Sequence, residues 1–200
     1  MRLLIATTNP GKVREYQDLL YGLAYEQVSL SDVGITQEVA ETGATYEENA
    51  LLKAREYAAL SGLLTLADDS GLEVDALGGR PGIQSARYAP DSPARIRQLL
   101  VEMQNIPASR RGARFQCVIA LAWPDGRAEI TTGTCEGQIA TAARGTNGFG
   151  FDPVFYVPAA GLTMAELPES RKNRISHRAR AAQKMRPILE RILREGVALK

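Results

Sequence analysis

The sequence predicts an α/β protein built on a mixed sheet. Strand and helix patterns alternate through the first half of the chain, and two long apolar segments in the second half form a hairpin around Pro124-Asp125-Gly126. With 200 residues, of which 44% are apolar, the chain can bury a core as one large domain or as two lobes that share a sheet. We therefore expect a single domain over residues 1–200.

The N-terminal segment predicts a strand, a helix and a second strand. Residues 2–7 are typical of a buried strand, and Asn9 followed by Pro10 is typical of a helix N-cap with proline in the first turn. We expect the helix over about residues 11–21 and the second strand near residues 25–30.

The next helix has the clearest local signals. Thr45 and Glu48 match a capping box, five apolar residues then fall on one stripe, and Gly62 ends the pattern. Asn49 and Lys53 are four residues apart, so they share a face outside that stripe, which can be plain surface.

The second half contains fewer helices and longer strands. In chain order we expect a loop at 78–82 and a helix capped by Asp91 or Ser92 with Pro93 at its start. There follow an alternating strand at 115–123, its hairpin partner at 128–140, a glycine-rich loop at 145–152, a strand at 153–157 and a last helix over 176–194.

Composition and charge exclude several classes of protein. The apolar runs are far shorter than the roughly 20 residues that span a bilayer, and the N-terminus resembles a strand rather than a signal peptide, so we expect a cytoplasmic protein. A net charge of +1 argues against a surface devoted to nucleic acid. Cys117 and Cys135 are expected to be free thiols.

Ligands of open α/β sheets bind beyond the carboxyl ends of strands. The segment Thr7-Thr8-Asn9-Pro10-Gly11-Lys12 follows the first strand and opens a helix, so its backbone N–H groups and the helix dipole favour an anion, and Lys12 adds positive charge. The alternative is that Asn9 is only a helix cap and Lys12 a solvated lysine.

Asp68 and Asp69 follow a short apolar strand predicted over residues 63–67. Paired carboxylates suit Mg²⁺, which binds through one or two carboxylates together with substrate phosphates. Alternatively, Asp68 is buried to brace the turn at Ser70 while Asp69 is solvated. Glu41 and Glu48 are candidates for a further ligand, although the capping box already explains Glu48.

The C-terminal region is strongly basic. Residues 171–186 include seven Lys or Arg and no acid, and they contain His177, the only histidine of the chain. This region predicts either a solvated basic helix face, an anion site for a nucleotide, or a surface for nucleic-acid phosphates. Phe149 and Phe151 flank Gly150 and offer either a stacking face for a ligand or core packing.

Five blocks in this order resemble the inosine triphosphate pyrophosphatase family. They are TTNPGK (7–12), ETGATYEENALLKA (41–54), ADDSGLEVDALGGRPGIQSARY (67–88), GFGFDPVF (148–155) and SHRARA (176–181). The resemblance implies an elongated two-lobed α/β fold with an active-site cleft between the lobes, a homodimer and an Mg²⁺-dependent enzyme. Such enzymes cleave ITP, dITP and XTP to the monophosphate and pyrophosphate, which removes deaminated purines from the nucleotide pool.

The resemblance also assigns roles to individual residues. It implies Asp69 as proton acceptor and metal ligand, Glu41 as second metal ligand, and substrate contacts by Thr7, Thr8, Asn9, Pro10, Gly11, Lys12, Ser70, Phe149, Gly150, Phe151, Asp152, Lys172, His177 and Arg178. His177 and Arg178 match the pair at the keto edge of the purine. Ala40 stands where many bacterial relatives have a second acid.

Elementary chemistry agrees with these assignments. Cleavage of a phosphoanhydride needs positive charge near the leaving pyrophosphate, which Lys12, Lys53 and Lys172 can supply, and a base for the attacking water, which Asp69 can supply. Asp68 is then mainly architectural. The rival interpretations are a nucleic-acid-binding module that uses the basic helix and a pyrophosphatase that acts on another base.

Overall fold

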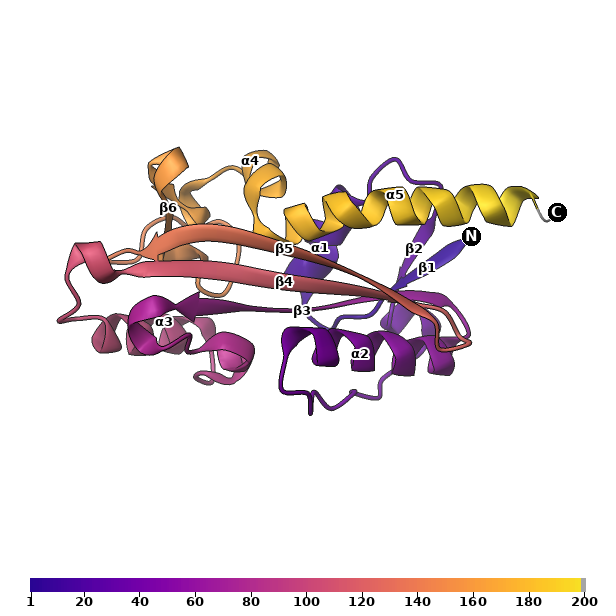
Figure 1. The fold of residues 1–200 in the computed structure, drawn as a ribbon, viewed down its shortest axis with the longest axis horizontal. Coiled ribbons are helices and arrows are strands. Elements are labelled where there is room, and N and C mark those ends of the chain that lie inside the picture. Colours follow the sequence, from indigo (N-terminus) through magenta and orange to yellow (C-terminus); the bar gives the residue numbers. More distant parts are fainter. Residues whose placement is uncertain (199–200) are drawn as a thin grey trace. The chain divides into compact units, whose positions relative to one another are not determined.

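The computed structural model, which describes residues 1–198, confirms the α/β class with a mixed sheet. Seven strands lie in the order β2-β1-β3-β4-β5-β6-β7 (Figure 1). β1 is parallel to β2 and β3, whereas β6 is antiparallel to β5 and β7. The strands are β1 (Arg2–Ile5), β2 (Glu26–Ser29), β3 (Leu64–Val74), β4 (Gly112–Ala122), β5 (Ala128–Ile139), β6 (Phe155–Val157) and β7 (Leu162–Thr163).

Five α-helices accompany the sheet in the described part of the chain. They are α1 (Pro10–Leu19), α2 (Tyr46–Ser61), α3 (Ser92–Glu102), α4 (Glu169–Ile175) and α5 (His177–Ala198). None of the helices within residues 1–198 is long and apolar enough to cross a membrane.

The chain divides into two compact units. Unit 1 contains residues 1–69, 117–133 and 178–198, and unit 2 contains residues 70–116 and 134–177. The long strands β3, β4 and β5, drawn in purple to orange in Figure 1, contribute residues to both units.

Unit 1 buries both faces of its strands. Leu3 and Ile5 of β1 pack in one core cluster with residues of α1 and α5, while Leu4 and Ala6 pack in a second cluster with residues of α2. Successive side chains of a strand point to opposite faces, so α1 and α5 cover one face and α2 covers the other. Burial on both faces explains why these strands are nearly continuous apolar runs.

Unit 2 has a separate apolar core. Its buried members come from the distal part of β3, from α3, from β4 and β5, and from the segment 151–167. Within it, Phe155 packs closely over Gly137 of β5, where a Cβ atom would lie 2.5 Å from the ring. Glycine at position 137 therefore leaves room for the Phe155 ring.

The main error of the sequence prediction is the length of β3. We expected a strand over 63–67 with the aspartates beyond its end, but β3 continues through Asp68 and Asp69 to Val74. Within β3, β1 pairs with Leu64 to Leu66, and the last of these pairs joins Ile5 to Leu66. The aspartates therefore lie beyond the end of β1 but within β3, which remains beside β4.

The helix caps were predicted better than the helix ends. Asn9 caps α1, and Asp91 caps α3. At α2 the Thr45 side chain accepts from the Glu48 amide, but Glu48 accepts from the Ala44 amide, so the predicted capping box is only half formed. The last helix begins one residue later than expected, at His177, and α4 and β7 were not anticipated.

Candidate active site

The structure places the predicted site residues in two groups. Unit 1 contains Thr7, Thr8, Asn9, Pro10, Gly11, Lys12, Glu41, Lys53, Asp69 and Arg178, and unit 2 contains Ser70, Phe149, Gly150, Phe151, Asp152, Lys172 and His177.

The two aspartates face opposite sides of β3. Leu66 belongs to the core cluster of α1 and α5 and Ala67 to that of α2, so strand alternation directs Asp68 toward the first helix pair and Asp69 toward α2. Both carboxylates are buried, with 2% and 6% of Asp68 and Asp69 exposed. The alternative in which Asp69 is solvated is therefore wrong.

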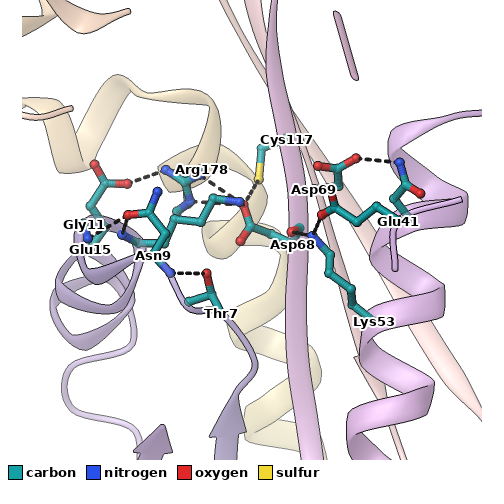
Figure 2. A network of polar contacts seen from close by, with 12 residues as sticks. Thr7, Asn9, Gly11, Glu15, Glu41, Lys53, Asp68, Asp69, Cys117 and Arg178 are labelled. Carbon is teal, nitrogen blue, oxygen red and sulfur yellow. Dashed lines mark hydrogen bonds and ion pairs between the residues drawn. The ribbon is translucent and has the colours of Figure 1, made fainter. Parts of the chain in front are cut away.

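Asp68 is surrounded by positive charge. Its Oδ2 atom lies 3.0 Å from Arg178 Nη2 (Figure 2). The same oxygen lies 3.0 Å from Lys12 Nζ. Arg178 is 1% exposed, and its Nη1 also donates to Glu15 Oε2 at 2.5 Å. Asp68 does not brace the following turn, as one alternative supposed; it joins α1 and α5 through two cations.

This network changes the pKa of Asp68 from that of an ordinary aspartate. Burial opposes its charge, but Lys12 and Arg178 outweigh burial and hold the pKa of Asp68 well below its usual value. Burial alone would lower the pKa of Arg178, but Asp68 and Glu15 raise that pKa well above its usual value. Asp68 and Arg178 are therefore both charged at every physiological pH.

Cys117 borders the same network. Its Sγ lies 3.7 Å from Asp68 Oδ2, and burial, reinforced by Asp68, raises the pKa of the thiol. A buried thiol with a raised pKa is unreactive. Cys117 and Cys135 are both free, as predicted.

Asp69 has the opposite environment. Its Oδ2 atom accepts a hydrogen bond from Asn49 Nδ2 at 3.1 Å, and the Gly43 amide donates to Asn49 Oδ1 at 2.8 Å. Burial raises the pKa of Asp69; Lys53 opposes the rise and Glu41 adds to it. Adjacent aspartates therefore have pKa values displaced in opposite directions.

Lys53 of α2 contacts both Glu41 and the backbone of β3. Its ammonium forms an ion pair with Glu41 and donates to the backbone carbonyl of Asp68 at 2.8 Å (Figure 2). The Asn49 side chain is fully buried, so the face of α2 that carries Asn49 and Lys53 is not plain surface.

The donor set fits a hard divalent cation. Asp69 and Glu41 offer the carboxylate oxygens that such a cation prefers, and Lys53, which pairs with Glu41 and donates to the Asp68 carbonyl, links the segments that carry them. Within residues 1–198, no group of three or more His, Cys, Asp or Glu is arranged to hold a metal ion. Two carboxylates suffice for Mg²⁺ when substrate phosphates complete its coordination.

The segment at the start of α1 forms the helix cap that the sequence predicted. Asn9 Oδ1 accepts from the amides of Gly11 and Lys12 at 2.8 and 3.3 Å, which is the capping role named as an alternative. Thr7 Oγ1 accepts from the Asn9 amide at 3.2 Å. The amides of Asn9, Gly11 and Lys12 therefore donate within the segment. The helix dipole and the Lys12 ammonium can still attract an anion, and this ammonium is paired with Asp68 rather than solvated.

In unit 2, a buried ion pair organises the glycine-rich loop. Asp152 Oδ2 accepts from Lys172 Nζ at 2.5 Å and from the Phe149 amide at 2.9 Å. Lys172 is 4% exposed, and its Nζ lies 4.8 Å from the centre of the Phe149 ring. Gly148 has φ +72°, and a Cβ atom there would overlap the Asp152 carboxylate.

The remaining predicted residues of unit 2 differ in burial. Phe151 is buried in the core and meets Tyr88 edge-on at 6.2 Å, so its side chain packs in the core, whereas Phe149 is half-buried. Ser70 is half-buried within β3. His177, at the start of α5, is 6% exposed and stacks on Phe115.

The basic C-terminal region is largely committed to contacts within the protein. Lys172 and Arg178 are buried in ion pairs, Lys184 donates to the Thr132 carbonyl, and Arg186 donates to the carbonyls of Leu19 and Tyr21. Lys172 and Arg178 therefore do not contribute to a solvated basic face, whereas hydrogen bonds to carbonyl oxygens leave the charges of Lys184 and Arg186 in place.

Sequence reasoning missed two residues of the site. Glu15 is buried beside Arg178, and its signal was its position three residues after Lys12 on the same helix face. Asn49 orients Asp69, and its signal was the shared helix face with Lys53.

The fold and site define an α/β protein in which carboxylates, lysines and a helix N-terminus gather around the middle of one strand. Comparison with known proteins agrees, because the Ham1 family model matches residues 3–188. The chain belongs to the Ham1 family.

Individual relatives match over nearly the whole chain. The dITP/XTP pyrophosphatase of Symbiobacterium thermophilum is 52% identical over 196 residues, which are 98% of each chain. That of Bacillus subtilis is 46% identical and covers 94% of this chain and 96% of its own. The structure of a HAM1 protein from Coxiella burnetii superposes with a TM-score of 0.87 at 40% identity and covers 96% of this chain and 99% of that chain.

Proposed function

We propose that this protein hydrolyses deaminated purine nucleoside triphosphates, namely ITP, dITP and XTP, to the monophosphate and pyrophosphate. The relatives named above are dITP/XTP pyrophosphatases, and the family is shared. The single observation that carries the chemistry is the placement of Asp68 and Asp69 on opposite sides of β3, where Asp68 pairs with Lys12 and Arg178 and Asp69 accepts from Asn49. In such a pair, one carboxylate can accept or donate a proton while the other remains a fixed negative charge.

The cations of unit 1 bind the triphosphate. Lys12 and Lys53 carry positive charge beside the aspartates, and the N-terminus of α1 adds its dipole. Charge accumulates on the leaving pyrophosphate during phosphoryl-group cleavage, so fixed positive charge lowers the barrier. Asp68 holds Lys12 in place and is not the base, because its low pKa makes it a poor proton acceptor.

Asp69 accepts the proton of the attacking water. Its raised pKa makes it a better base than Asp68, and the Asn49 amide orients its carboxylate. We propose Mg²⁺ as the cofactor, held by Asp69 and Glu41; when bound, the ion polarises the phosphate and lowers the pKa of water. Lys53, which now pairs with Glu41, is then available to the substrate phosphates.

Base selection is assigned to the residues of unit 2. Phe149 offers a ring for stacking, and His177 offers a donor for the 6-keto group of hypoxanthine or xanthine. Adenine presents an amino donor at that position, so a site that donates there leaves its own donor unpaired against ATP, which supports strong discrimination. The ion pairs of Arg178 with Glu15 and Asp68 favour a supporting role for this residue rather than direct contact with the base.

Turnover of ITP, dITP, XTP, GTP, ATP and dUTP, each with and without Mg²⁺, tests the proposal. ITP should yield IMP and pyrophosphate in equal amounts, only in the presence of the metal, and ATP should be a poor substrate. IDP with free orthophosphate would contradict cleavage between the α- and β-phosphates, and preferred turnover of dUTP would indicate another base. The cytoplasmic location and the homodimer expected from the sequence belong to the same proposal.

A further inference from the structure

We propose that Phe115 is a positioning residue for base recognition, because its ring fixes the plane of the His177 imidazole. The two rings stack with centroids 4.6 Å apart and an interplanar angle of 17°. Both side chains are buried, with 7% of Phe115 and 6% of His177 exposed. This inference rests on the proposed function for the role of His177, but the stack itself does not.

A second aromatic ring packs against Phe115. Phe155 lies 4.4 Å from Phe115, centre to centre, at an angle of 43°, and Phe155 is itself fully buried over Gly137. Phe115 of β4 therefore contacts two rings, one from β6 and one from the start of α5, and the ring from β6 packs over Gly137 of β5. Close packing of this kind leaves the Phe115 ring little freedom to tilt.

A fixed ring plane matters because a hydrogen bond from imidazole is directional. The donor N–H lies in the plane of the ring, and hydrogen bonds weaken steeply when the donor angle departs from linear. Rotation of the imidazole about its bond to Cβ would turn the N–H away from a keto oxygen in the plane of the purine. By holding the imidazole plane, Phe115 makes the discrimination between a keto and an amino group sharper.

The first test observes the stack directly. His177 is the only histidine of the chain, so its imidazole proton signals need no assignment against other histidines. In the wild-type protein these signals should be displaced upfield by the ring current of Phe115. They should move downfield in Phe115→Leu, which keeps an apolar side chain but removes the ring, and stay near their wild-type positions in Phe115→Tyr, which keeps the ring.

The second test measures selection between substrates. In Phe115→Leu, the ratio of kcat/KM for ITP to that for ATP should fall by about twofold to tenfold, the range that an aromatic pair contributes. The loss should appear mainly as a higher KM for ITP, because the stack acts on binding of the base and not on the attacking water. Phe115→Tyr should restore the ratio.

A matched core variant separates positioning from general destabilisation. Leu99 of α3 is fully buried in the same core cluster as Phe115, and Leu99→Ala removes at least as much packing without removing a ring. Leu99→Ala should lower the melting temperature while leaving the substrate ratio and the His177 signals unchanged.

The proposal is overturned if Phe115→Leu leaves the His177 signals in place. It is equally overturned if the signals move and the ITP/ATP ratio stays constant, or if Leu99→Ala lowers the ratio as much as Phe115→Leu. Failure of the proposed function is a different result, since it is judged on turnover of the substrate panel by the wild-type protein.

Discussion

The adjacent aspartates should respond to the same substitution in opposite ways. Asp68→Asn removes a buried negative charge that accepts hydrogen bonds from Lys12 and Arg178. Arg178 then keeps only Glu15 among these acids, and Lys12 loses its partner in a largely buried position. Breaking a buried ion pair from one side costs about 3–5 kcal/mol, because a charge is left uncompensated.

This cost converts to a large change in melting temperature. For a chain of this size, 1 kcal/mol corresponds to about 2–4 °C, so Asp68→Asn should melt about 6–20 °C below the wild type. Differential scanning calorimetry or circular dichroism at pH 7 measures the shift. Activity assayed well below the new melting temperature then separates the effect on stability from the effect on turnover.

Asp69→Asn is the matched control at the next position. Burial raises the pKa of Asp69, which means that its negative charge lowers the stability of the folded protein. The side-chain amide introduced by Asp69→Asn keeps an oxygen that can accept from Asn49. This variant should melt at or above the wild-type temperature yet lose at least about 10²-fold in turnover, the scale for a positioned base. Equal melting temperatures for the two variants, or near wild-type turnover of Asp69→Asn, would refute the assignment.

Three further predictions concern pH, Arg178 and the glycine-rich loop. Because the pKa of Asp68 is depressed on folding, its stabilisation is present above about pH 3.9, the usual Asp pKa, and is lost as the pH falls toward the folded value; acid titration of stability should show this loss in the wild type and not in Asp68→Asn. Arg178→Ala should lower kcat/KM for ITP and ATP by a similar factor, and a smaller ITP/ATP ratio would instead show that Arg178 contacts the base. Gly148→Ala should raise the KM for ITP more than Gly150→Ala does, since both positions have positive φ but only the first Cβ would displace Asp152; equal effects would indicate backbone strain alone.

Several features of the site could be predicted from the sequence because they depend on neighbouring residues. Asn9 caps α1 through amides two and three residues away, and Gly62 ends α2 with a positive φ that favours glycine. The pair Asp68 and Asp69 stood out for the same reason, since two adjacent carboxylates after an apolar run need a compensating charge. The cap, the helix end and the adjacent carboxylates are visible in the sequence because each involves residues close together in the chain, whereas the charges that compensate Asp68 come from distant segments.

The choice between alternatives depended on contacts between distant segments. The sequence left Lys12 as a solvated or a functional lysine, and the structure excludes the solvated alternative by placing Asp68 3.0 Å from its ammonium. Phe149 and Phe151 looked equivalent in the sequence, yet only Phe151 is buried in the core. There it contacts Tyr88, which comes from a distant part of the chain.

The sequence by itself determined the α/β class, the caps, the free thiols and the segments that carry the site, because periodicity and short-range hydrogen bonds are local properties of the chain. Only the tertiary structure decided that β3 continues through the aspartates, and that Arg178 pairs with Glu15, 163 residues away, and with Asp68, 110 residues away. Those ion pairs form where packing of α1 and α5 against one face of the sheet brings the charges together. No local pattern of the sequence encodes these contacts, so the displacement of the two aspartate pKa values in opposite directions is a property of the folded protein.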